Sequence, residues 1–285
     1  MGVMLIVVSA ASFGVMPIFA NLAYQSGATP ISVLFLRFTG AAIVMIIWGW
    51  QRKCPLPRGK TLLILALLGC LGYAGQSFSY FTALTFAPAA TVALLLYLYP
   101  VLVTGLSVLF FRHRLTKLDL LALVFALTGT VLVIGMEVGG KLPGILLSLA
   151  AACIYAAYII VSTHVTRTMN AFSSAAVIIT AASVVYGGLV AWQGLHLPAT
   201  PRGWGAVAAL TLISTVLAIV TFLAGLKRIG PVKSSMLSTL EPVVTVIFAV
   251  IFLGESLTLP KIIGGLMVLT TAILLARNEI TTTDR

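Results

Sequence analysis

Residues 89–111 have the sequence AATVALLLYLYPVLVTGLSVLFF, an apolar run that contains no charged side chain. A bilayer core of about 30 Å is crossed by about 20 helical residues. The run is therefore long enough to cross a membrane as a helix, and Pro100 lies near its middle.

The composition of the whole chain agrees with that one segment. The chain has 285 residues, of which 60% are hydrophobic and only 8% are charged, whereas about 25% of the residues of a soluble domain are charged. Most of the surface must therefore face lipid. The net charge of +11 could indicate nucleic acid, but the basic residues lie in short loops rather than on one polar face, so we expect a lipid bilayer and no nucleic acid as a partner.

Apolar runs of similar length fill the rest of the chain. We predict an all-α membrane protein with ten transmembrane helices, in a single membrane domain covering residues 1–285, because no loop has room for a soluble domain. The predicted spans are Val3–Tyr24, Ile31–Trp50, Thr61–Leu84, Ala89–Phe111, Leu118–Met136, Leu142–Thr163, Phe172–Gly194, Trp204–Leu226, Val232–Leu253 and Ile262–Ala276.

The quoted stretch has a counterpart later in the chain. Residues 84–132 align with residues 226–274 without a gap. Pro100-Val101 then falls on Pro242-Val243, and Leu115-Thr116 falls on Leu257-Thr258. Matched leucines mean little in so apolar a chain, whereas two matched dipeptides in one ungapped alignment indicate an internal repeat.

The predicted repeats, residues 1–138 and 139–285, hold five spans each. Because five is odd, the two halves would enter the membrane from opposite sides. Inverted repeats are typical of secondary transporters, whose substrate site lies near the bilayer midplane between the halves. The pattern therefore predicts ten helices as two inverted five-helix repeats around a central cavity.

The basic residues predict the orientation of the chain. Alternate loops, with the C-terminal tail, hold 13 of the 17 Lys and Arg residues. These loops are residues 51–60, 112–117, 165–171 and 227–233. The other loops hold only Lys141, Arg202 and Lys261. Cytoplasmic loops carry an excess of Lys and Arg, so we expect a multi-pass protein of the inner (plasma) membrane with both termini in the cytoplasm.

Several short motifs of the second half resemble those of a known family. The residues are Leu240-Glu241-Pro242-Val243, Leu253-Gly254-Glu255, Leu257-Thr258 and Gly264-Gly265. They resemble the second-repeat signature of the EamA-type drug/metabolite transporter superfamily, and Leu36-Arg37-Phe38 resembles that family's early basic residue. The Tyr-rich third and fourth spans are similar to those of the YddG-like amino-acid exporter branch. The resemblance in span layout covers the whole chain.

This resemblance implies an exporter of small solutes of amino-acid type. It also implies a central cavity lined mainly by spans three, four, eight and nine, with help from spans one, two, six and seven, and with spans five and ten at the periphery. Where the family often has a second Glu-Pro and Gly-Glu, this chain has Tyr99-Pro100 and Arg112-His113. That departure weakens any transfer of a mechanism based on paired carboxylates.

Glu241 is the only acid well inside a span, about ten residues from the start of its span and so near mid-depth. A carboxylate at the bilayer centre costs about 2.5–3.5 kcal/mol on insertion scales, which makes such a residue a functional candidate. It can hold the ammonium group of a substrate, or it can take up a proton and couple transport to pH. The alternative is a hydrogen bond to a neighbouring helix that fixes a kink at Pro242.

Polar and aromatic side chains in three spans complete the predicted substrate-binding set: Gln76, Ser79, Tyr80, Tyr97, Tyr99, Tyr155 and Tyr158. A buried tyrosine offers a flat apolar face and a hydroxyl group that needs a partner, which suits an amino acid, although each tyrosine could equally serve packing. Tyr97 and Tyr99 are two residues apart and point to different faces of one helix. We therefore expect at most one of them to face the centre of the cavity.

Other residues inside the spans have structural interpretations. We expect Arg37 to snorkel toward the surface or to make a structural contact, rather than to pair with a substrate carboxylate. Pro100 and Pro242 predict either plain kinks or freed backbone groups beside a wet cavity. Three small residues in one span predict close approach of helices: Gly69, Gly72 and Gly75.

The motifs of membrane enzymes are missing from the sequence. It has no HExxH run, no GxSxG elbow and no pair of intramembrane Asp residues, and its three cysteines lack metal-ligand spacing. We therefore expect no catalysis, no cofactor and no metal site. A multispan enzyme and a channel remain alternatives, but the sequence favours a secondary transporter of small organic solutes that works by alternating access, as a monomer or a weak homo-oligomer.

Overall fold

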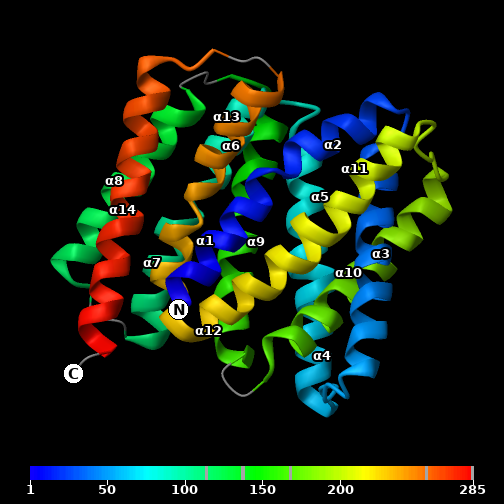
Figure 1. Ribbon diagram of the computed structural model, residues 1–285, viewed down its shortest axis with the longest axis horizontal. Coiled ribbons are helices and arrows are strands. Elements are labelled where there is room, and N and C mark those ends of the chain that lie inside the picture. The colour runs from blue at the N-terminus through cyan, green and yellow to red at the C-terminus, as the bar shows by residue number, and fades with distance from the viewer. Residues whose placement is uncertain (113–114, 136–138, 167–168, 254–255, 284–285) are drawn as a thin grey trace.

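The computed structural model is an assembly of helices (Figure 1) and describes residues 1–112, 115–135, 139–166, 169–253 and 256–283, apart from the side chains of residues 253 and 277–283. Within these ranges there is no strand. Nine helical segments of the described chain are long and apolar enough to cross a membrane, and Leu240–Phe252 is a shorter apolar helix. The predicted all-α membrane class is confirmed.

The helices of the first half are α1 (Gly2–Gly14), α2 (Met16–Gln25), α3 (Pro30–Gln51), α4 (Gly59–Leu67), the π-helical η1 (Leu68–Tyr73), α5 (Ala74–Ala83), α6 (Ala89–Leu96), α7 (Tyr99–Phe111) and α8 (Lys117–Ile134). Those of the second half are α9 (Leu142–Thr166), α10 (Ala171–Gln193), α11 (Pro201–Thr211), the π-helical η2 (Leu212–Leu217), α12 (Ala218–Leu237), α13 (Leu240–Leu253) and α14 (Leu259–Thr283). The signature residues Gly254 and Glu255, and His113, lie outside the described residues.

The predicted span Val232–Leu253 is not a single helix. The structure divides Val232–Leu253 between the end of α12 and the separate helix α13. The cause is local, because Gly230 leaves the helical conformation with φ 77° and residues 238–239 form a turn. Only glycine adopts such a φ without strain. Residues 201–237 therefore form one long helical segment with a break at Gly230, followed by a short helix.

The two mid-span prolines do not kink continuous helices. Turns at residues 97–98 and 238–239 come just before them, so that Pro100 and Pro242 lie in the first turns of α7 and α13. The amide groups of a first helical turn have no partner inside the helix, so a proline there removes no hydrogen bond. Each span is thus broken into two half-helices near its middle.

The starts of several helices recur at the spacing of the sequence repeat. Helix α4 begins at Gly59 and α11 at Pro201, while α8 begins at Lys117 and α14 at Leu259. Within each pair the two starts are separated by the same number of residues as Pro100 and Pro242. The matched Leu-Thr dipeptides directly precede α8 and α14. At the first of them, the backbone amide of Asp119 donates to the Thr116 hydroxyl (3.1 Å) and the Asp119 carboxylate accepts from the Thr116 amide (3.0 Å), which forms a capping box.

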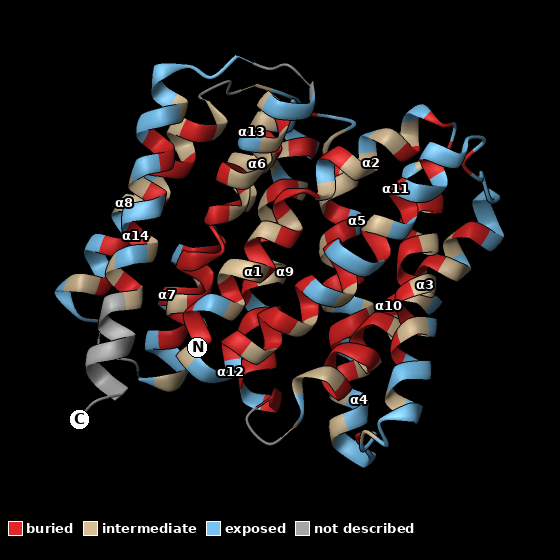
Figure 2. Ribbon diagram, viewed as in Figure 1, coloured by how far each residue is buried: buried red, intermediate tan, exposed pale blue. Residues whose placement is uncertain are grey.

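Helices from the two halves pack side by side. Helix α8 lies along α14 at the left edge of Figure 1, α1 lies along α12, and α3 lies along α10. At the first contact, a Cβ atom added to Gly264 would lie 2.5 Å from the carbonyl oxygen of Gly129, so the two backbones nearly touch. Figure 2 shows the buried residues gathered along α1, α9 and α12 in the middle of the molecule, while α8 and α14 expose their outer faces.

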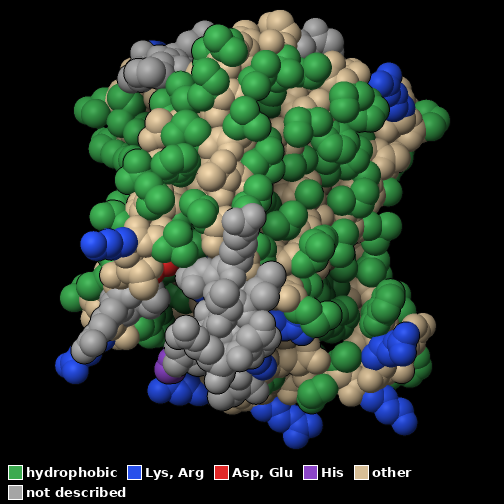
Figure 3. Space-filling model, turned by 60° about the vertical axis from the view of Figure 1, so that its left-hand side comes forward, with side chains coloured by type: hydrophobic (Ala, Val, Ile, Leu, Met, Phe, Trp, Pro, Cys, Tyr) green, Lys and Arg blue, Asp and Glu red, His purple; other side chains and the backbone are tan. Residues whose placement is uncertain are grey.

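The outer surface fits a lipid environment. Figure 3 shows one face covered mainly by hydrophobic side chains, with Lys and Arg gathered toward its lower end. The four tryptophans lie at or near helix ends and are exposed: Trp48, Trp50, Trp192 and Trp204. Tryptophans at both ends of membrane helices are typical of interfacial belts. The chain is therefore a multi-pass membrane protein.

The glycines of span three allow a matched test of the packing. A Cβ atom on Gly69 would collide with the backbone of Ile178 and lie 2.7 Å from the Ala181 Cβ, whereas one on Gly75 would meet nothing within 4 Å. We expect Gly69→Ala to destabilise the protein by about 1–3 kcal/mol through overpacking and to lower Tm by several degrees. Gly75→Ala should leave Tm nearly unchanged. Thermal unfolding in detergent measures both variants, and equal Tm values would contradict the close packing at Gly69.

Candidate substrate-binding cavity

A cavity of about 430 Å³ lies between the broken helices and is called the central cavity below. Its walls are formed by Phe13, Met16, Pro17, Arg37, Tyr73, Gln76, Ser77, Tyr80, Phe81, Ala89, Ala90, Ala93, Leu96, Tyr97, Tyr99, Val133, Ile134, Tyr155, Glu241, Pro242, Thr245, Val246 and Lys261. The predicted site residues Gln76, Tyr80, Tyr97, Tyr99, Tyr155 and Glu241 are all in this wall. Ser79 and Tyr158 are not.

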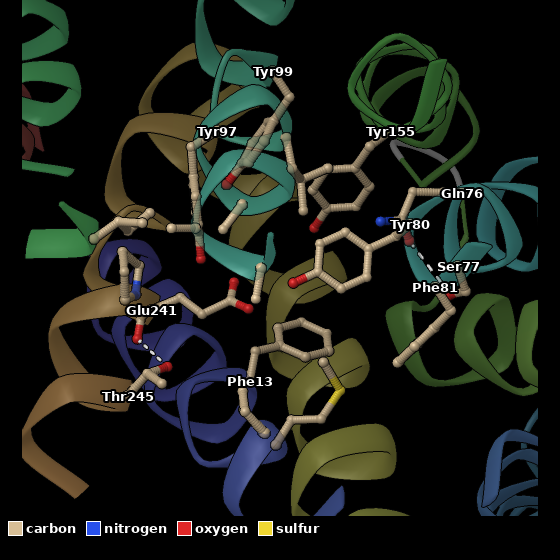
Figure 4. Close-up of a pocket in the computed structure, with 18 of the residues that line it drawn as sticks. Phe13, Gln76, Ser77, Tyr80, Phe81, Tyr97, Tyr99, Tyr155, Glu241 and Thr245 are labelled. Atoms are coloured by element: carbon tan, nitrogen blue, oxygen red, sulfur yellow. Dashed lines mark hydrogen bonds between the residues drawn. The ribbon is translucent and has the colours of Figure 1, made fainter. Parts of the chain in front are cut away.

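The carboxylate of Glu241 extends into this cavity from the first turn of α13 (Figure 4). It points toward the hydroxyl groups of Tyr97 and Tyr80, which come from the opposite wall. The first turn of a helix presents free amide groups and a partial positive charge, which favour a carboxylate there. No described residue forms an ion pair with Glu241, and its carboxyl group faces the cavity and the tyrosine hydroxyls.

Glu241 is held in place by a break in span one. Pro17 lacks the amide that would bond to the preceding turn, and the chain leaves one helix and starts the next at Val15. The Thr245 hydroxyl, one turn after Glu241, lies 2.8 Å from the carbonyl oxygen of Gly14 and 3.0 Å from that of Glu241. A Cβ atom on Gly14 would lie 2.7 Å from the Glu241 carbonyl oxygen, so glycine is required for this contact.

Tyr97 and Tyr99 both line the cavity, whereas the sequence predicted that they point to different faces of one helix, with at most one of them at the centre of the cavity. That expectation assumed one continuous helix. The turn at residues 97–98 lies between α6 and α7. The two side chains therefore do not point to different faces of one continuous helix, and both can line the cavity. The ring of Tyr99 also packs edge-on against Tyr155 at 4.8 Å between centroids, and its hydroxyl donates to the Ser235 carbonyl oxygen at 3.4 Å.

One face of span three supplies a large part of the wall. Tyr73, Gln76, Ser77 and Tyr80 are spaced i, i+3, i+4 and i+7, which places them on one side of a helix. Ser79 falls outside this face and is buried. Tyr73 and Ser77 were missed in the sequence, although the same periodicity starting from Gln76 and Tyr80 could have indicated them.

Tyr158 lies behind the wall rather than in it. Its ring packs against Tyr73 and Tyr155, with centroids 5.8 and 5.9 Å away. The residue is only 2% exposed. Tyr158 therefore supports two cavity tyrosines and does not itself meet the cavity.

Arg37 is a cavity residue that the sequence did not identify as one. The snorkelling that we expected is wrong, because the side chain is only 4% exposed and lines the cavity. The expected structural contacts are present: its guanidinium lies 2.8 Å from the Met16 sulfur, 3.5 Å from the Tyr73 hydroxyl and 4.6 Å above the centre of the Phe38 ring. The position of Arg37 beside Met16 of span one was not visible in the sequence.

The lining also corrects which spans surround the cavity. No residue of the predicted spans seven and eight is in the wall, while Val133 and Ile134 of span five are, together with Lys261, which directly precedes the predicted span ten. The reason is that α1 covers the second half of span eight. The Ser9 hydroxyl donates to the Ala218 carbonyl oxygen at 2.8 Å, and a Cβ on Gly225 would lie 2.6 Å from the Ile6 side chain.

The chemistry of this wall is that of a binding site. It offers flat aromatic faces, several hydroxyl groups, one amide, one carboxylate and two cations. A cavity of a few hundred Å³ with a mostly apolar wall and a few polar groups is typical of sites for small molecules. Within the described residues, no group of three or more His, Cys, Asp or Glu side chains could hold a metal ion.

The chain is similar to known transporters in sequence, and to a solved structure in fold. The model of the EamA-like transporter family matches residues 1–135 and again residues 142–277. The uncharacterized transporter YcbK of Bacillus subtilis (strain 168) is 27% identical over 278 residues, covering 92% of this chain and 88% of its own. The aromatic amino acid exporter YddG of Ancylobacter novellus is 29% identical over 245 residues, covering 80% and 81%. A crystal structure at 23% identity superposes with a TM-score of 0.82, covers 96% of this chain and 95% of its own, and shows the shared fold.

The contact between Thr245 and Gly14 gives a test of how the cavity is held. Thr245→Val keeps the shape of the side chain but removes the hydroxyl, so the Gly14 carbonyl loses a donor. We expect a loss of about 1 kcal/mol in the free energy of unfolding and a Tm lower by a few degrees. Thr245→Ser keeps the hydroxyl and should stay closer to the parent protein. If the two variants melt together, the hydrogen bond does not contribute.

Proposed function

The chain belongs to the EamA-like transporter family, and from this premise we propose that it is a secondary transporter that exports small organic solutes of amino-acid type across the inner membrane. The observation that carries the proposal is the central cavity, in which the Glu241 carboxylate faces tyrosine hydroxyls. The ammonium group of an amino acid would bind Glu241, and its side chain would lie against the tyrosine rings. The similarity to an aromatic amino acid exporter supports this substrate class.

Alternating access between two inverted five-helix repeats is the proposed mechanism. Two matches to one family model, at residues 1–135 and 142–277, support the repeat. The breaks near residues 97–98 and 238–239 support it further, because each half has a broken span that reaches the cavity. If the halves are inverted, the same packing can be exchanged between them, which gives two states of similar energy that open to opposite sides.

The cavity reaches one end of the molecule. Its wall includes Ala89 at the start of α6 and Lys261 near the start of α14. Beyond Tyr99 the structure is packed, with Val103 fully buried and Phe222 only 2% exposed. Under the orientation that the basic loops predict, with both termini cytoplasmic, Lys261 is external and this is an outward-open state.

Buried hydroxyl groups in the packed half support a second, inward-open state. In the described structure the serine hydroxyls buried there without a hydrogen-bond partner include those of Ser173 and Ser174 in α10 and Ser234 in α12. A buried hydroxyl without a partner is costly. Opening α10 and α12 to the cytoplasm would let water reach these groups and would recover that cost.

Transport by the purified protein tests the proposal directly. In proteoliposomes we expect saturable flux of an aromatic amino acid without ATP, and non-saturating flux at channel rates would contradict a carrier. Glu241→Gln should lower flux per folded molecule by at least about tenfold, because a hydrogen bond to a charged group is worth about 1.5–3 kcal/mol. Size-exclusion profiles control for folding, and unchanged flux would remove Glu241 from the site.

The aromatic wall has its own matched test. Tyr80→Ala and Tyr99→Ala each remove a ring from the cavity and should raise the apparent KM for an aromatic amino acid by about tenfold, given roughly 0.5–1.5 kcal/mol for one aromatic contact in addition to its buried area. Ser79→Ala changes a neighbour of Tyr80 outside the wall and should leave the KM unchanged. A shift of equal size in all three variants would indicate a general effect on folding.

Thiol labelling in intact cells tests the orientation. One variant carries Lys261→Cys as its single cysteine, and it should react with a membrane-impermeant maleimide added outside, because Lys261 is at the open end of the cavity. A second variant keeps only the native Cys54, in a loop predicted to be cytoplasmic, and it should react only after the cells are lysed. The reverse pattern would invert the assignment of the open end.

A further inference from the structure

Arg37 is a buried cation that no described carboxylate neutralises. It is 4% exposed, and none of the described residues forms an ion pair with it. Its two hydrogen-bond partners in the described structure are neutral, the Met16 thioether at 2.8 Å and the Tyr73 hydroxyl at 3.5 Å. Its Nε atom is buried without any partner there. The positive charge and most of its donor groups are therefore left unmatched by the described protein.

This arrangement is costly unless a ligand completes it. A guanidinium group has five N–H donors, and a thioether is a weak acceptor. A charged side chain away from water costs a great deal of free energy unless it is paired and hydrogen-bonded, and ionisable residues inside membrane proteins usually face a cavity and mark a functional position. Arg37 fits that description, because it lines the central cavity although it is almost fully buried.

The surroundings of Arg37 hold it rigidly. Its guanidinium lies 4.6 Å above the centre of the Phe38 ring. Phe38 in turn stacks on Tyr186 and meets Tyr73 edge-on, with 5.5 Å between centroids in both pairs. A guanidinium stacked on fixed rings loses little freedom when it binds a ligand. These contacts orient the cation without neutralising its charge.

We propose that Arg37 binds the carboxylate of the transported solute, at the opposite end of the substrate from Glu241. The proposal rests on the transport function proposed above and specifies its substrate class as a zwitterion. Arginine matches a carboxylate with two parallel hydrogen bonds, and the unpartnered Nε is one of the donors available for them. The two groups come from different helices, Arg37 from α3 and Glu241 from α13. The cavity would therefore bind both the carboxylate and the ammonium group of an amino acid.

Three related ligands separate the two charges: L-phenylalanine has both, 2-phenylethylamine has only the ammonium group, and 3-phenylpropionate has only the carboxylate. Their binding to purified protein is measured by ligand-induced shifts in Tm and by titration. Arg37→Gln should lower the affinity for L-phenylalanine and for 3-phenylpropionate by about 10- to 100-fold. Its affinity for 2-phenylethylamine should fall by less than about threefold. Glu241→Gln should show the opposite selectivity. It should lower the affinity for L-phenylalanine and 2-phenylethylamine, which carry an ammonium group, and leave the affinity for 3-phenylpropionate unchanged.

Two further variants control the measurement. Arg37→Lys keeps the charge but loses the planar fork, so its affinity for 3-phenylpropionate should fall between those of the parent and Arg37→Gln. Arg202→Gln removes one positive charge from an exposed position outside the cavity and should bind all three ligands like the parent. A uniform loss for the three ligands in Arg37→Gln would mean that Arg37 only supports the fold, and it would overturn the proposal.

The experiment also separates this inference from the transport proposal. If 3-phenylpropionate binds in an Arg37-dependent way while amino acids are not transported, the carboxylate site stands and the proposed substrate class is wrong. If amino acids are transported and Arg37→Gln does not discriminate among the three ligands, the transport proposal stands and the role of Arg37 is refuted. Failure of the parent protein to bind either carboxylate ligand would also refute it.

Discussion

The contact between the break in span one and the first turn of α13 is the constraint on which the cavity depends. Lipid offers no hydrogen bonds, so backbone groups freed inside a bilayer must be bonded within the protein or to water in a cavity. Here the Thr245 hydroxyl bonds the Gly14 carbonyl oxygen across the two helices. The missing side chain of Gly14 lets α13 come close enough for this bond. The preceding turn of α13 carries Glu241, so its position follows from how the break is satisfied.

The tyrosines connect that cavity to the packed half of the molecule. Tyr155 contacts Tyr99 in the wall, Tyr158 behind it and Phe222 of α12, with ring centroids 4.8, 5.9 and 6.5 Å away. Packed cores tend to switch between discrete arrangements rather than deform continuously. A movement of α12 would therefore alter the rings that line the cavity, which under the proposed transport function offers a physical link between solute binding and the opening of the other side.

Several features of the site were predictable because they are local in the sequence. Glu241 is conspicuous as the one acid well inside an apolar run, and it does line the cavity. Gln76 and Tyr80 lie on one helical face, and that periodicity also includes Tyr73 and excludes Ser79. Arg37 was expected to snorkel or to make a structural contact, and only the second holds, because the direction of its side chain depends on Phe38 and on helices that are distant in the chain.

The sequence by itself determined the membrane class and the approximate spans, because both depend only on the hydropathy of bilayer-length segments, and its matched dipeptides predicted an internal repeat. Only the tertiary structure decided where the spans break, which is why Tyr97 and Tyr99 both reach the cavity and why Val232–Leu253 is not one helix. It also decided that α1, rather than span eight, borders the cavity. The break at Gly14 is stabilised because another helix supplies a hydrogen bond to its carbonyl oxygen, through Thr245. Because these two residues lie in opposite halves of the chain, their partnership leaves no signal in the local sequence.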